Sequence, residues 1–104
     1  MASSVFVLPS LASPRRGDFI VLEDDAAEAL RESEGAVLTS AISPWGTDAV
    51  FNRFQLAQLL DELKNAIAAT DDPVRANLQA VHDFIEFRAL GGAHANFYVM
   101  FLTD

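Results

Sequence analysis

The chain has 104 residues, which is the length of one ordinary domain. Hydrophobic residues make up 51% of it, including eight Phe, so the chain can bury a core and is not disordered. Fifteen acidic residues against seven basic ones give a net charge of −8, which argues against nucleic acid as a partner. Cysteine is absent, which excludes a disulfide scaffold, a thiolate nucleophile and any Cys-ligated metal.

Neither a membrane span nor a signal peptide is expected from the apolar runs. The longest uninterrupted run, Phe97 to Leu102, is far shorter than the roughly 20 residues that a membrane helix needs. The apolar stretch Val5 to Leu8 is too short for a signal peptide, and no basic region precedes it. We therefore expect a cytoplasmic domain, and no motif indicates a cofactor.

Two short strands are predicted at the start of the chain. Val5 to Leu8 and Asp18 to Leu22 are rich in β-branched or aromatic residues and are bounded by turn residues. A Pro- and Ser-containing turn over residues 9–17 separates them. A helix follows, because Asp24 or Asp25 can cap it and alanines then favour helix. Gly35 is a natural end for this helix.

A third strand is predicted over Ala36 to Ile42, followed by a loop over Ser43 to Gly46. Two amphipathic helices come next. The first carries an apolar stripe at helical spacing, made by Leu56, Leu59, Leu60, Leu63 and Ile67. The second begins near Asp72-Pro73 and has an apolar stripe made by Val74, Leu78, Val81 and Ile85. Its expected solvent side consists of Arg75, Gln79, His82, Asp83 and Glu86.

The last strand is predicted over Asn96 to Leu102, and it is apolar on both faces. We therefore expect it in the middle of the sheet, where both faces are covered. The order of elements is β-β-α-β-α-α-β. The sequence thus predicts a single α+β domain over residues 1–104, a two-layer sandwich in which a small mixed sheet of about four strands packs with three helices.

Acidic residues concentrate in one short segment. Residues 18–34 hold seven acids and one base, Arg31, and so carry a net charge of −6. Ionised carboxylates are almost never buried without partners, so this segment should form an exposed negative surface. An alternative is that these acids only keep an apolar-rich domain soluble. The residues expected to bind a partner are Glu23, Asp24, Asp25, Glu28, Glu32 and Trp45.

Aromatic residues offer a second kind of contact. Trp45 lies in a loop between Pro44 and Gly46, where it either contacts a partner or covers the edge of the core. Phe54 and Phe87 lie away from the apolar stripes of their helices. These two side chains either meet another element of the fold or form apolar surface positions through which the chain dimerises.

Few residues of the sequence suit an enzymatic function. His82 and Glu86 are four residues apart on one helix, and His94 follows in a loop, so a small enzyme using both histidines and nearby carboxylates is the alternative function. No metal site is expected, because zinc normally takes three or four ligands. The acidic run from Glu23 to Asp25 lacks the alternating ligands and central Gly of a calcium loop.

The last sixty residues contain a W-G-x-D loop at Trp45, the run V-F-N-R-F-Q-L-A-Q-L-L-D-E-L and the terminal F-Y-V-M-F-L-T-D. In these segments the chain resembles small uncharacterised proteins common in actinobacteria, some of which look like immunity components of toxin systems. The resemblance includes no catalytic motif and gives no residue a role, but it implies a binding protein. We therefore expect a non-enzymatic acidic domain that engages a basic protein partner, with immunity-type inhibition of a basic toxin as the most specific form.

Overall fold

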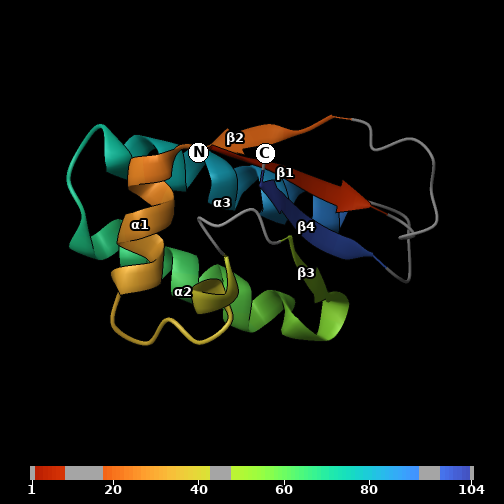
Figure 1. Ribbon diagram of the computed structural model, residues 1–104. Coiled ribbons are helices and arrows are strands. Elements are labelled where there is room, and N and C mark those ends of the chain that lie inside the picture. Colours follow the sequence, from red (N-terminus) through yellow and green to blue (C-terminus); the bar gives the residue numbers. More distant parts are fainter. Residues whose placement is uncertain (1, 9–17, 43–47, 92–96, 104) are drawn as a thin grey trace.

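Four strands form a sheet in the order β2-β1-β4-β3, and every neighbouring pair is antiparallel. The structure is a computed structural model that describes residues 2–8, 18–42, 48–91 and 97–103 (Figure 1). The strands are β1 (Ser3–Leu8), β2 (Ile20–Leu22), β3 (Ala49–Asn52) and β4 (Tyr98–Thr103). The helices are α1 (Asp24–Glu32), α2 (Leu56–Ala69) and α3 (Val74–Gly91), with short 3-10 turns η1 (Thr39–Ala41) and η2 (Arg53–Gln55).

One hydrophobic core lies between the sheet and the three α-helices. Side chains alternate along each strand, so Val5, Val99 and Phe101 face the helices whereas Phe6 and Met100 lie in a small cluster on the opposite face. The helices contribute side chains that are completely buried, namely Ala26, Leu30, Leu59, Leu63, Ala66, Leu78, Val81 and Ile85. The fold is therefore a two-layer α+β sandwich with the predicted order of strands and helices.

Strand β4 lies between β1 and β3, as the sequence predicted from its two apolar faces. The sheet, however, is antiparallel throughout and not mixed. The reason lies in the helical hairpin between β3 and β4. Helix α2 leads away from the end of β3 and α3 leads back, so β4 begins with Tyr98 opposite Asn52 and runs in the reverse direction.

The prediction of a strand over Ala36 to Ile42 is wrong. This segment contains the 3-10 turn η1, and the third strand is Ala49–Asn52 instead. Backbone N–H groups of Val37, Leu38 and Thr39 are taken by the carboxylate of Glu62, so they cannot join a sheet. Among the described residues, no helix is long and apolar enough to cross a membrane.

Candidate functional site

Four carboxylates line the exposed side of helix α1. The helix buries Ala26, Ala27 and Leu30 against the core. At about 100° per residue, the four acids fall within an arc of about 100° on the other side. All of them are exposed, and we call this set the acidic face: Asp24, Asp25, Glu28 and Glu32. The sequence therefore predicted both the exposure of these acids and their grouping on one surface.

The start of α1 differs from the predicted cap. Neither aspartate caps the helix, because Glu23 is the N-cap residue and makes no side-chain cap hydrogen bond. Asp24 and Asp25 occupy the first turn instead, where negative charge interacts favourably with the helix dipole. Exposed Glu23 adds a further carboxyl group at this end of the acidic face.

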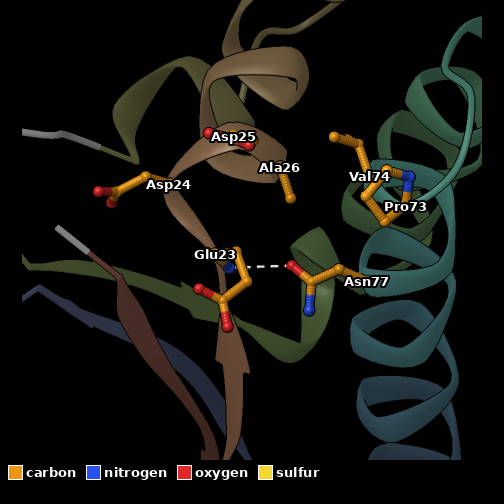
Figure 2. Close-up of a pocket in the computed structure, with 7 residues that line it drawn as sticks. All are labelled: Glu23, Asp24, Asp25, Ala26, Pro73, Val74 and Asn77. Carbon is orange, nitrogen blue, oxygen red and sulfur yellow. Dashed lines mark hydrogen bonds between the residues drawn. The ribbon is translucent and has the colours of Figure 1, made fainter.

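Asn77 of α3 holds the junction between β2 and α1. Its Oδ1 accepts a hydrogen bond from the Glu23 backbone N–H at 2.9 Å (Figure 2). Its Nδ2 donates to the Val21 carbonyl, also at 2.9 Å. The Val21 carbonyl and the Glu23 N–H lie on either side of Leu22. The Asn77 side-chain amide therefore bonds to the edge strand β2 in the way that a neighbouring strand would. This contact fixes the direction in which α1 leaves the sheet.

A pocket of about 230 Å³ lies beside this junction, between the first turns of α1 and α3. Figure 2 shows Pro73 and Val74 on one side of it, with Asp24 extending away from them. Among the described residues, no three His, Cys, Asp or Glu side chains are placed to hold a metal ion. The pocket is lined by Glu23, Asp24, Asp25, Ala26, Pro73, Val74 and Asn77.

The last turn of α1 is hydrogen-bonded to the following segment, which contains η1. Arg31, the single base of residues 18–34, donates from Nη1 to the Ile42 carbonyl at 3.3 Å. The same segment is held from α2 by Glu62, whose side chain is only 4% exposed. Burial would raise the pKa of this carboxyl group, but hydrogen bonds from Thr39, Leu38 and Gln58 outweigh it, so the pKa lies below its ordinary value.

Sequence reasoning missed Glu62 as a structural residue. The available signal was its position on α2 next to Leu63 in the apolar stripe, where a charged residue requires hydrogen-bond partners. Its backbone partners lie 23 to 25 residues earlier in the chain, and no local pattern identifies them. Hydrogen bonds near both ends of α1 thus hold in place the helix that carries the exposed acids.

The histidine prediction is wrong for His82. This residue was expected on the solvent side of α3 but is only 4% exposed. It lies four residues after Leu78 and three before Ile85, so it shares their buried side. Its Nδ1 lies 3.0 Å from Asp83 Oδ1, and its buried Nε2 has no hydrogen-bond partner.

The enzyme site predicted from both histidines is only partly covered by the described residues. His82 bonds to its neighbour Asp83, and this hydrogen bond, with a second one from Gln79, lowers the pKa of the Asp83 carboxyl group. His94 lies outside the described residues, as does Trp45. The two helical aromatics, Phe54 and Phe87, are exposed rather than packed into the core.

Comparison with known proteins gave no match: neither a protein-family model, nor a curated protein, nor a solved structure is similar to this chain.

Proposed function

We propose that this chain is a non-enzymatic binding domain that engages a basic protein partner through the acidic face of α1. The observation that carries the proposal is the exposure of Asp24, Asp25, Glu28 and Glu32 on one side of one helix. Such an arrangement creates a local negative potential that attracts a basic surface and raises its rate of association.

The orientation of this helix supports the same function. Asn77 bonds to the backbone at its N-terminal junction, and Arg31 connects its last turn to the following segment. A binding surface that is already ordered loses less conformational entropy when a partner docks. A cytoplasmic location, and inhibition of a basic toxin in the manner of an immunity protein, are the most specific form of this proposal.

The test is a charge reversal on the acidic face. Glu28→Lys/Glu32→Lys changes two exposed side chains without touching the core. The matched control, Asp48→Lys/Asp61→Lys, makes the same change in net charge at exposed positions outside α1. Both variants should keep the wild-type circular dichroism spectrum, because surface substitutions rarely alter stability by more than about 0.5 kcal/mol.

Association of each variant with a co-purified partner is then measured at low and at high ionic strength. At low ionic strength, the reversal on α1 should slow association by roughly ten-fold or more, and the control should slow it much less. At high ionic strength, the three rates should converge because salt screens exposed charges. An association rate that changes neither with ionic strength nor with these charge reversals would refute the proposal. The acids would then serve only to keep the domain soluble.

Exposed aromatic side chains favour a second candidate function, assembly into a homodimer. Phe54 is 80% exposed in the 3-10 turn η2 that precedes α2, and Phe87 is 74% exposed on α3. Large apolar side chains at such exposure are available for an interface. Sedimentation of the wild type and of Phe54→Ser/Phe87→Ser separates the two functions: a dimer that dissociates in the double variant supports assembly, and a monomeric wild type excludes it.

A further inference from the structure

The segment Val37–Thr39 surrounds one carboxylate with hydrogen-bond donors. Glu62 Oε1 accepts from the backbone N–H of Val37 at 3.0 Å, from that of Thr39 at 2.9 Å and from the Thr39 hydroxyl at 2.8 Å. Oε2 accepts from the Leu38 N–H at 3.1 Å and from Gln58 Nε2 at 3.0 Å. Both oxygens of the anion are therefore bonded on more than one side.

These five donors differ from the partners of an ordinary ion pair because each of them is neutral. Three are consecutive backbone amides, and the others are a hydroxyl group and a side-chain amide. Successive N–H groups that point into one concavity bind anions in many proteins through their fixed dipoles. Hydrogen bonds to an ionised acceptor are also about twice as strong as those between neutral groups.

The carboxylate that these donors surround belongs to another element of the chain, helix α2. Glu62 reaches the segment from α2, where Leu59 and Leu63 on either side are completely buried. The Thr39 side chain is also completely buried, so the carboxylate is bound away from solvent. Its free energy of desolvation must be offset by the donors that surround it.

We propose that Val37–Thr39 is an anion-binding segment in its own right, that Glu62 is its resident intramolecular ligand, and that a small carboxylate from solution takes its place when this side chain is shortened. The chemistry of the substitution defines the ligand. Glu62→Ala removes Cγ, Cδ and both oxygens, and these four atoms have the composition and shape of acetate. The donors remain in the chain, and a carboxylate in the resulting cavity satisfies them again.

The donor arrangement also sets the selectivity. Three donors converge on one oxygen and two on the other, which suits the two oxygens of a planar carboxylate. Chloride presents a single centre and cannot place an acceptor atom at both oxygen positions at once, so it should bind more weakly. Propionate has one carbon more than the deleted group and should clash with the surrounding side chains, because cores tolerate added methylene groups poorly.

The experiment measures the thermal stability of Glu62→Ala in sodium acetate, formate, propionate and chloride at equal ionic strength. For an affinity of about 10 mM, 0.1 M acetate multiplies the ratio of folded to unfolded protein about ten-fold relative to chloride. Acetate and formate should stabilise the variant more than propionate does. Glu62→Gln is the matched control, because its amide fills the cavity and leaves no room for an anion, so acetate and chloride should act alike on it.

If Glu62→Ala is unfolded in chloride, the same titration is followed by circular dichroism in trimethylamine N-oxide, which favours the compact state without using the site. Saturable refolding by acetate supports the proposal. Equal effects of acetate and chloride on the alanine variant would overturn it, as would an equal response of the glutamine variant to acetate. The result does not depend on the proposed partner, because no partner enters the assay.

Discussion

Substitution of Asn77 tests how α1 is held against the rest of the fold. Asn77→Leu keeps a side chain of similar size but removes both 2.9 Å hydrogen bonds, to the Glu23 N–H and to the Val21 carbonyl. A net hydrogen bond contributes about 0.5–1.5 kcal/mol to stability. The Glu23 N–H is exposed and finds water after the substitution, whereas the Val21 carbonyl is partly buried. We expect the free energy of unfolding to fall by about 1–3 kcal/mol.

Urea denaturation gives this difference, and amide hydrogen exchange shows where it arises. The Glu23 amide should lose protection by more than the global change, whereas Val99 in the central strand should follow global stability. Gln79→Leu on the same helix is the control, since the Gln79 amide bonds to Asp83 on the exposed side, and the cost of this substitution should stay within about 0.5 kcal/mol. Equal costs for the two leucine variants would refute the positioning role of Asn77.

The core and the titrating groups give further expectations. Leu63→Ala and Ile85→Ala remove completely buried side chains and should each cost about 2–5 kcal/mol in urea denaturation; changes under about 0.5 kcal/mol at both would contradict the packing. The folded-state pKa of Glu62 lies below its ordinary value of 4.5, so its contribution is present above that pH and is lost as the pH falls through the lower, folded-state pKa. Denaturation at pH 3 and pH 7 should therefore show a smaller acid-induced loss for Glu62→Gln than for the wild type, and equal losses would count against this role. Elemental analysis should find no stoichiometric transition metal, whereas about one zinc per chain, removed by chelator with loss of stability, would disprove that expectation.

Local pattern alone predicted the parts of the fold that depend on near neighbours. The apolar stripes of α2 and α3 predicted apolar side chains that pack in the core, and Leu63 and Ile85 are completely buried as expected. The two apolar faces of β4 predicted its central position in the sheet. The charge of residues 18–34 predicted an exposed acidic surface, because carboxylates without partners stay in water.

Tertiary contacts decided what these patterns could not. Ala36 to Ile42 has the composition of a strand, yet Glu62 on a later helix takes three of its N–H groups and the segment turns instead. His82 has the polarity of a surface residue, but the packing of α3 encloses it. Asn77 meets the start of α1 across 54 residues of chain. The hydrogen bonds of Glu62 to this segment and of Asn77 to the start of α1 join residues far apart in sequence, and a bond of that kind leaves no periodic trace in the amino-acid order.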